Sequence, residues 1–238
     1  MATKTLNQNI NQAISDFKGV KQAIIDKGVE IPSGTPTSEY GAKISEIQSG
    51  GGGLDISGIT DFNYLCVSNR FNNQLDKLDT SRGTTFHSTF NNCTSLTTIP
   101  KLDTSQGTIF YAMFYYCTSL TTVPSLDTSS GTNFDNMFYN CTSLTTISLT
   151  SFVSSSGMFY KCSALENLTV TGKITVSNNY LDLSYSTKLT VESLLSVLNA
   201  LADNTGKTKR TICLGSTNLA KLTDAQKAIA TNKNYTLA

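Results

Sequence analysis

The sequence predicts an α+β fold in which a short solenoid of repeated units lies between a helical N-terminal module and a C-terminal cap of helices and strands. The main observation is a 24-residue period, which places a Phe-x-x-Cys string in register at residues 90–93, 114–117 and 138–141. A period of roughly 20 to 50 residues indicates a unit that buries its apolar face only against further copies of itself. Such stacked units usually serve as binding surfaces.

The other apolar positions return with the same period. They are Phe86, Phe110 and Phe134; Leu96, Leu120 and Leu144; Ile99, Val123 and Ile147; and the Leu-Asp-Thr-Ser runs that begin at Leu78, Leu102 and Leu126. A degenerate leading copy and a trailing copy that arrives three residues early complete the array, with Phe62, Cys66, Leu75 and Leu78 in the first and Phe159, Cys162, Leu165 and Leu168 in the second. End copies are expected to differ because each has only one neighbour.

Each unit divides into an extended part and a turn. Apolar residues recur every third position at Leu96, Ile99 and Leu102, a leucine-rich-repeat spacing in which an extended segment and a bend point each of them inward. The run 103–105 followed by Gly107 predicts a turn, since short oxygen-bearing side chains bond their own backbone and glycine permits a positive φ.

Two further expectations concern the local conformation of the unit. Pro100 and Pro124 are expected to stop the extended segment from continuing as an ordinary strand. Residues 86–93 carry Phe86, Thr89, Phe90 and Cys93 at helical offsets, which predicts a short helical or 3₁₀ turn on the far side of the coil.

The repeat resembles the BspA-type leucine-rich repeat of bacterial and phage surface proteins. The resemblance covers about residues 60–170 and is carried by Met-Phe-x-x-Cys, Leu-x-x-Val/Ile-Pro and Leu-Asp-Thr-Ser in fixed order, as in residues 113–129. It implies an adhesive or ligand-binding solenoid without catalysis. Residues 23–40 and 219–233 in turn resemble the termini of tail fibres, head fibres and receptor-binding proteins of phages from gut or Gram-positive bacteria.

The N-terminal module predicts a helical seam. Apolar residues alternate spacings of four and three, as in a coiled coil, at Leu6, Ile10, Ala13, Phe17, Val20 and Ile24. The seam either packs on a second helix ending near Ile47 or drives oligomerisation. We favour self-association, with a trimer expected, or docking to another virion protein, because a helical hairpin of about 45 residues has little core of its own.

The segment after the repeats predicts a cap. A helix is expected from Thr190 through Asn204, with an apolar stripe of Leu194, Leu195, Leu198 and Leu201. A strand at 211–214, a helix opened by the Thr223–Gln226 capping box and a closing strand at 235–237 follow. The expected organisation is an attachment and oligomerisation module at 1–49, a glycine linker at 50–53, the solenoid at 54–186 and the cap at 187–238.

Composition and charge exclude several functions. A net charge of +1 gives no electrostatic reason for a nucleic-acid partner, and no apolar run is long enough for membrane insertion. With His87 as the single histidine, we expect no metal site and no cofactor. We expect no enzymatic activity, because the recurring Asp79, Asp103 and Asp127 are explained as turn formers, although a polysaccharide depolymerase using paired carboxylates stays open.

The cysteines share one repeat position. Cys93, Cys117, Cys141 and Cys162 are expected to form a column of buried free thiols that behave as small apolar residues. Disulfides are the less favoured alternative, and zinc is disfavoured because no converging ligands accompany the thiols.

A candidate ligand-binding surface also follows from the register. Tyr115, Tyr139 and Tyr160 directly follow the core phenylalanines and are expected to form a column on the surface. At another position His87, Tyr111 and Asp135 differ in every copy, so packing does not dictate the residue there. Tyrosine offers a rigid stacking face and a hydroxyl, which suits sugars or protein loops. The alternative is that these rings simply cover the coil half-buried.

The expected function is that of a virion surface protein. A protein that resembles an adhesin but begins without a secretory signal is expected to be made in the bacterial cytoplasm and to leave within a virion. There it would act as a tail fibre or receptor-binding protein whose solenoid binds a host-surface glycan or protein. The alternatives are a structural capsid decoration or head fibre protein and a cellular BspA-like adhesin.

Overall fold

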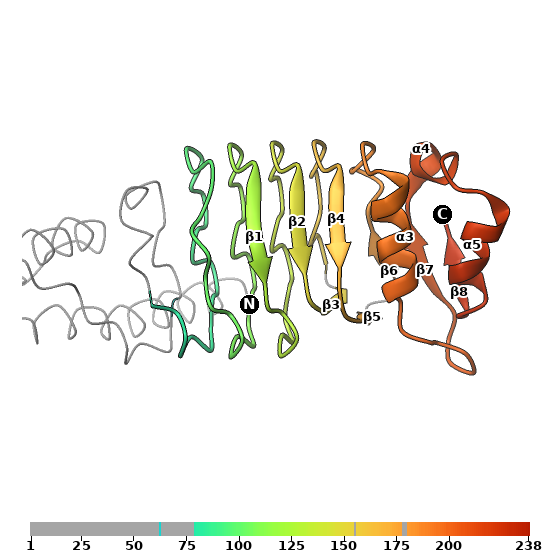
Figure 1. The fold of residues 1–238 in the computed structure, drawn as a ribbon, viewed down its shortest axis with the longest axis horizontal. Helices are drawn as coiled ribbons and strands as arrows, with labels where there is room; N and C mark the ends of the chain where they lie inside the picture. The colour runs from blue at the N-terminus through green and yellow to red at the C-terminus, as the bar shows by residue number, and fades with distance from the viewer. Residues whose placement is uncertain (1–61, 63–78, 155, 178–179) are drawn as a thin grey trace, which may run out of the picture.

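The structure is a computed structural model that describes residues 62, 79–154, 156–177 and 180–238. The fold is mixed α/β with short parallel sheets. Figure 1 shows the repeated turns side by side along the long axis, with the helices at the C-terminal end. The elements are β1 (Thr122–Leu126), β2 (Thr146–Leu149), β3 (Phe152–Ser154), β4 (Asn167–Val170), β5 (Ile174–Val176), β6 (Tyr180–Asp182), α3 (Val191–Ala200), β7 (Arg210–Cys213), α4 (Gly215–Leu219), α5 (Asp224–Thr231) and β8 (Tyr235–Leu237).

The sheets run across the turns, because each strand pairs with the matching segment of the next turn. They have the orders β1-β2-β4, β3-β5 and β6-β7-β8. The predicted register is confirmed by parallel bridges between residues 24 apart, such as Thr98 with Thr122 and Ile109 with both Thr85 and Asn133. In β1 and β2, Val123 lies opposite Ile147.

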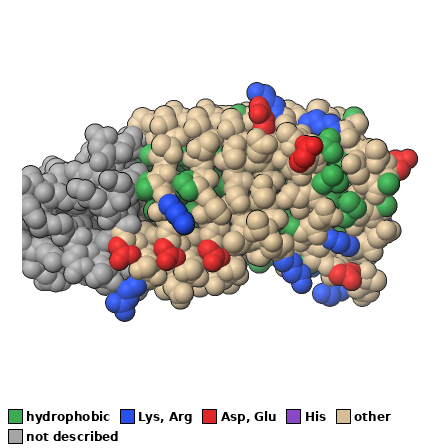
Figure 2. Space-filling model, viewed as in Figure 1, with side chains coloured by type: hydrophobic (Ala, Val, Ile, Leu, Met, Phe, Trp, Pro, Cys, Tyr) green, Lys and Arg blue, Asp and Glu red, His purple; other side chains and the backbone are tan. Residues whose placement is uncertain are grey.

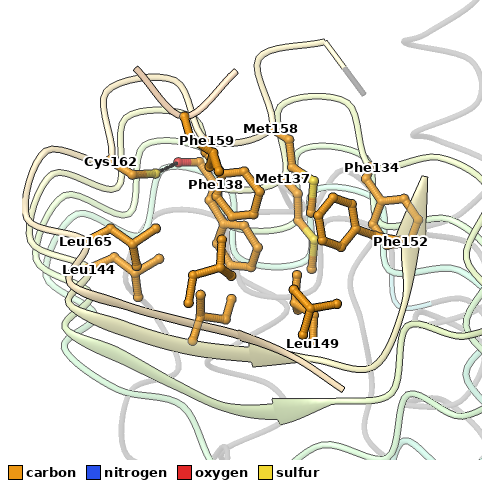
Figure 3. Packing of buried hydrophobic residues seen from close by; sticks show 14 of the residues in the cluster. Phe134, Met137, Phe138, Leu144, Leu149, Phe152, Met158, Phe159, Cys162 and Leu165 are labelled. Carbon is orange, nitrogen blue, oxygen red and sulfur yellow. Dashed lines mark hydrogen bonds between the residues drawn. The ribbon is translucent and has the colours of Figure 1, made fainter. Parts of the chain in front are cut away.

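Two columns of stacked phenylalanine rings fill the core. In the first, the ring centroids of Phe62, Phe86, Phe110 and Phe134 follow one another at 5.4, 5.6 and 5.3 Å. In the second, those of Phe90, Phe114, Phe138 and Phe159 follow at 5.3, 5.3 and 5.8 Å. Figure 3 shows Phe138 and Phe159 stacked beside Met137 and Met158. The trailing copy and the Phe62 position of the leading copy are therefore confirmed.

The segment after Phe86 is not the short helix that its spacing predicts. It consists of consecutive tight turns, because Ser88 and Asn92 adopt left-handed φ values of 54° and 58°. The Thr89 and Cys93 amides donate within the turn, to the carbonyls three residues earlier, whereas the Phe90 amide donates to the Met113 carbonyl of the next turn at 2.9 Å. Hydrogen bonds thus alternate between the local turn and its neighbour, which a helix does not allow.

Two expectations about single residues are also wrong. Pro100 lies outside the strands as expected, whereas Pro124 lies within β1, at a shift of its register against β2 between Val123 and Leu126. Gly107 does close the turn, its amide donating to the Thr104 carbonyl at 2.8 Å, but its φ is not positive. Space is what requires glycine there, since a β-carbon would lie 2.5 Å from Cζ of Phe110.

Helix α3 takes the place of the next strand at the edge of the β1-β2-β4 sheet (Figure 1). The Ser193 and Ser196 hydroxyls accept hydrogen bonds from the Leu168 and Val170 amides of β4, at 3.0 and 2.9 Å. These hydroxyls occupy the edge of β4 in place of a further strand. The helix ends at Ala200, four residues before the predicted Asn204.

The helix α3 ends early because the chain returns to the parallel ladder. Leu201 forms a bridge with Ile174 of β5, and the Ala202 amide donates to the Ile174 carbonyl at 2.8 Å. Lys233 replaces a conventional cap, since its Nζ donates to the carbonyls of Leu198, Asn199 and Leu201 at 3.2, 2.7 and 2.9 Å.

The predicted capping box and closing strand are confirmed. Thr223 and Gln226 exchange side-chain to backbone hydrogen bonds at the start of α5, and β8 spans Tyr235–Leu237. The short helix α4 was not predicted. The heptad residues Leu6 to Ile24 and the glycine linker lie outside the described residues, so the oligomerisation module stays a prediction. Within the described part of the chain, no helix is long and apolar enough to cross a membrane.

Candidate functional site

The turn after each core phenylalanine places one tyrosine at the surface. Phe114 is buried in its column, whereas Tyr115 is partly exposed and Tyr116, with a left-handed φ of 59°, turns the chain back toward Cys117. Because this turn is repeated in successive units, Tyr139 and Tyr160 lie at matching positions. The regular backbone therefore sets the spacing of the rings.

The structure brings the predicted tyrosines together. The ring centroids of Tyr115 and Tyr139 lie 5.0 Å apart with an angle of 24° between the rings, and those of Tyr139 and Tyr160 lie 4.6 Å apart at 22°. Two further rings join them: Tyr116, 5.7 Å from Tyr139, and Tyr185, 4.5 Å from Tyr160. We call these five residues the tyrosine column: Tyr115, Tyr116, Tyr139, Tyr160 and Tyr185.

Tyr185 was missed because the copy of the repeat after residue 170 lacks the phenylalanine and cysteine of the earlier copies. Leu183, Ser186 and Leu189 follow Phe159, Cys162 and Leu165 at a distance of 24 residues, and all of them are buried. The Ser186 hydroxyl donates to the Cys162 carbonyl at 3.1 Å, at the position of the cysteine thiols. The signal was therefore a Leu-x-x-Ser-x-x-Leu string in register with the preceding repeats.

The rings of the column cover one another's faces. Tyr115, Tyr139 and Tyr160 are half-buried in this stack, and burial raises the pKa of Tyr115, with smaller contributions from Tyr116 and Tyr139. The outer rings are more accessible: Tyr116 is 37% exposed, and Tyr185, tilted by 58° from Tyr160, is 41% exposed. The stacking face expected of every tyrosine is thus offered mainly by the rings outside the central stack.

The second predicted position is only partly assembled. His87 and Tyr111 meet edge to face with their ring centroids 4.7 Å apart. The Asp135 carboxylate instead accepts a hydrogen bond from the Ser156 amide at 2.8 Å, and the Asp135 amide donates to the Asn133 side chain. Asp135 therefore supports the local backbone and is not part of the contact between His87 and Tyr111.

The cysteines form the predicted column of buried free thiols. The Cys117, Cys141 and Cys162 thiols donate to the carbonyls of Phe90, Phe114 and Phe138 at 3.0, 3.0 and 3.1 Å. Burial is the main cause that raises the pKa of all three thiols, that of Cys162 to about 12. These sulfurs stabilise the stack rather than react.

The repeated aspartates are turn formers, as predicted. Asp103 and Asp127 each accept from the amide and hydroxyl of the serine two residues later, and these bonds lower the pKa of both carboxyls. With Asp79 they line a shallow hollow of about 630 Å³. Figure 2 shows acidic side chains in a row on a face that is otherwise mostly uncharged. The described ranges contain no group of three or more His, Cys, Asp or Glu side chains that could hold a metal ion.

The fold and the tyrosine column define a class, a repeat protein whose stacked turns display an aromatic surface. Residues 38–152, just under half of the chain, are similar to the family described as "Mycoplasma protein of unknown function, DUF285", which is related to BspA-like leucine-rich repeats. The matched segment includes the Phe-x-x-Cys strings at 90–93, 114–117 and 138–141. No curated protein and no solved structure matches the chain.

Proposed function

We propose that the chain is a non-enzymatic surface protein whose turns form a leucine-rich-repeat solenoid of the BspA type and bind a ligand of a bacterial surface through the tyrosine column. The observation that carries this proposal is the column itself, five tyrosines gathered on successive turns of a rigid scaffold. Tyrosine supplies contact area and a hydroxyl at a low entropic cost, so such a surface suits recognition.

The rest of the surface supports a binding role over catalysis. The aspartates of the repeats are engaged in their own turns, and the buried thiols have raised pKa values. Threonine side chains hold the turns together: the Thr121 and Thr145 hydroxyls donate to the Thr97 and Thr121 carbonyls of the preceding turn, each at 3.0 Å. Hydroxyl groups thus serve the scaffold and leave the tyrosines as the distinctive surface feature.

We further propose a virion location, as a phage tail fibre or receptor-binding protein attached through residues 1–49. What supports this location is the resemblance of residues 23–40 and 219–233 to the termini of phage structural proteins and the heptad seam from Leu6 to Ile24. The partners would be other virion proteins, a host-surface glycan or protein, and further copies of the chain in a trimer.

Two experiments test these proposals. Labelled full-length protein should bind saturably to cells from a panel of Gram-positive gut bacteria, whereas a purely structural decoration protein would show no saturable binding. Antibody labelling of virions should place the chain at a tail or on a capsid surface, and its absence from purified virions would contradict the virion location.

A cellular adhesin is the second candidate, favoured by the similarity to a family described for a mycoplasma protein. For this candidate the antibody should label the surface of the producing cell and not the virion. Both candidates keep the tyrosine column as the binding surface, so the location experiment separates them without affecting the binding proposal.

A further inference from the structure

A cavity lies at the C-terminal end of the tyrosine column. Tyr139, Tyr160 and Tyr185 line this space of about 270 Å³, together with Asn136, Ser156 and Asp182. Met158 and Leu181, both buried, provide apolar atoms in its lining. Aromatic walls, an apolar lining and a few convergent polar groups are the usual composition of a small-molecule site.

Two of the polar groups have hydrogen-bonding capacity to spare. Asp182 Oδ1 accepts from the Ser184 amide at 2.9 Å and from the Ser184 hydroxyl at 2.7 Å, which fixes the carboxylate in place. Among the residues that the structure describes, no group donates a hydrogen bond to Asp182 Oδ2. The side-chain amide of Asn136 has no hydrogen-bond partner among them either. A carboxylate oxygen and an amide are thus held at the cavity ready for a ligand.

The cavity is also lined by the most accessible ring of the tyrosine column. Tyr115, Tyr139 and Tyr160 stack on one another, whereas Tyr185 is tilted by 58° from Tyr160 and is 41% exposed. A ligand that needs both an accessible aromatic ring and a cavity therefore finds them together at this end of the column.

We infer that this cavity binds one neutral sugar ring, with the C–H groups of the sugar against Tyr185 and its hydroxyls bonded to Asp182 and Asn136. A carboxylate accepts strong hydrogen bonds from hydroxyls, and its charge disfavours an acidic sugar. The volume of about 270 Å³ lies just below the roughly 300 to 1,000 Å³ of sites for drug-sized ligands, so it suits a single ring. The inference rests on the proposed surface-binding function and names its ligand class and position.

The test measures binding of the labelled full-length protein to bacterial cells that are untreated, treated with periodate to cleave vicinal diols, or treated with protease. The cavity variants are Tyr185→Ala and Asp182→Asn, which keeps an oxygen for the Ser184 bonds. The control is Thr121→Ala, because Thr121 is exposed and belongs neither to the tyrosine column nor to the lining of the cavity. Melting temperatures verify that each variant is folded.

Binding should be lost after periodate and survive protease. Tyr185→Ala and Asp182→Asn should weaken it about tenfold or more, whereas Thr121→Ala should change it less than about twofold. Binding that survives periodate but not protease would overturn the sugar, and tighter binding by Asp182→Asn would overturn its neutrality. Wild-type binding with an unaffected Tyr185→Ala variant would overturn the position alone, whereas no wild-type binding to any cells would reject the proposed function itself.

Discussion

The Phe110 ring occupies the space that a side chain at position 107 would need, since a β-carbon on Gly107 would lie 2.5 Å from Cζ of the ring. The same relationship recurs one turn earlier and one turn later, at 2.5 Å between Gly83 and Phe86 and at 2.1 Å between Gly131 and Phe134. The glycine of each repeat is therefore fixed by the phenylalanine column.

Gly107→Ala should destabilise the protein by about 1 to 3 kcal/mol, because the added methyl group overpacks a buried ring. Urea unfolding measures the loss. In the double variant with Phe110→Leu, the clash is relieved, so the combined loss should be smaller than the sum of the two single losses. Strictly additive losses would show that the glycine has another role.

Phe114→Ala should cost about 3 to 5 kcal/mol, because it opens a cavity between two neighbouring rings. Phe90 and Phe138 both lie 5.3 Å from Phe114, centroid to centroid, so both lose contacts. Tyr116→Ala, at an exposed position of the same turn, is the control and should cost far less. An unchanged melting temperature of the Phe114 variant would refute the register of the stack.

Protonation of Asp127 should make the protein less stable in acid. Its Oδ1 accepts from the Ser129 hydroxyl at 2.6 Å, the Ser129 amide at 3.0 Å and the Thr150 hydroxyl at 3.0 Å, and the two Ser129 bonds are the main cause that lowers its pKa. Because the pKa is lower in the folded state, the stabilisation is present above the ordinary carboxyl pKa of about 3.9 and is lost as the pH falls through the folded value.

Urea unfolding at pH 6 and at successive values below 4 measures this effect. The wild type should lose more stability over that range than Asp127→Asn, in which the titrating group is absent. Asp103→Asn should behave alike, since the pKa of Asp103 is lowered by the same kind of bonds to Ser105. Parallel acid profiles for wild type and both variants would contradict the turn-forming role of these carboxylates.

The native thiols should react slowly with a thiol reagent. In a Cys66→Ser background, Cys93, Cys117, Cys141 and Cys162 should react only as fast as the protein opens, because all four are buried and burial raises the pKa of the last three. Cys213, which is only partly buried, should react first. Fast reaction of two or more of the four in the native state would contradict the thiol column.

The 24-residue period made the core predictable. Identical residues at one repeat position must stack when the units stack, so Phe90, Phe114 and Phe138 and the cysteine column follow from register alone. The local turns did not follow, because residues spaced by three and four occur both in a helix and in two consecutive turns. The left-handed φ values of Ser88 and Asn92 are what make the segment two turns rather than a helix. The sequence gives no sign of them, because neither residue is a glycine.

The candidate site was predictable only in part. The period places Tyr115, Tyr139 and Tyr160 at one position, and the structure brings their rings together. The period could not show that the rings cover one another's faces, because that depends on side-chain orientation. Tyr185 and Asp182 were not predicted as site residues, because leucine and serine replace phenylalanine and cysteine in their turn. The motif that defined the repeat is therefore absent there.

The N-terminal seam stays a prediction with its own test. Ile10→Asp combined with Phe17→Asp should abolish oligomerisation or virion attachment, because unpaired charges cannot be buried in a helical seam. Sedimentation of the full-length protein should show an oligomer, with a trimer expected, and the double variant should be monomeric. A wild-type monomer whose double variant still enters virions would leave residues 1–49 without the proposed role.

The claim that the tyrosine column binds a bacterial surface ligand is tested most directly by an equilibrium binding isotherm on cells. Tyr139→Ser removes the ring that stacks on both Tyr115 and Tyr160. The control, Thr121→Ala, removes an exposed hydroxyl just before β1, outside the tyrosine column. We predict saturable binding by wild type and by Thr121→Ala, and loss of the saturable component in a folded Tyr139→Ser protein. Equal isotherms for all three proteins would contradict a binding role for the column.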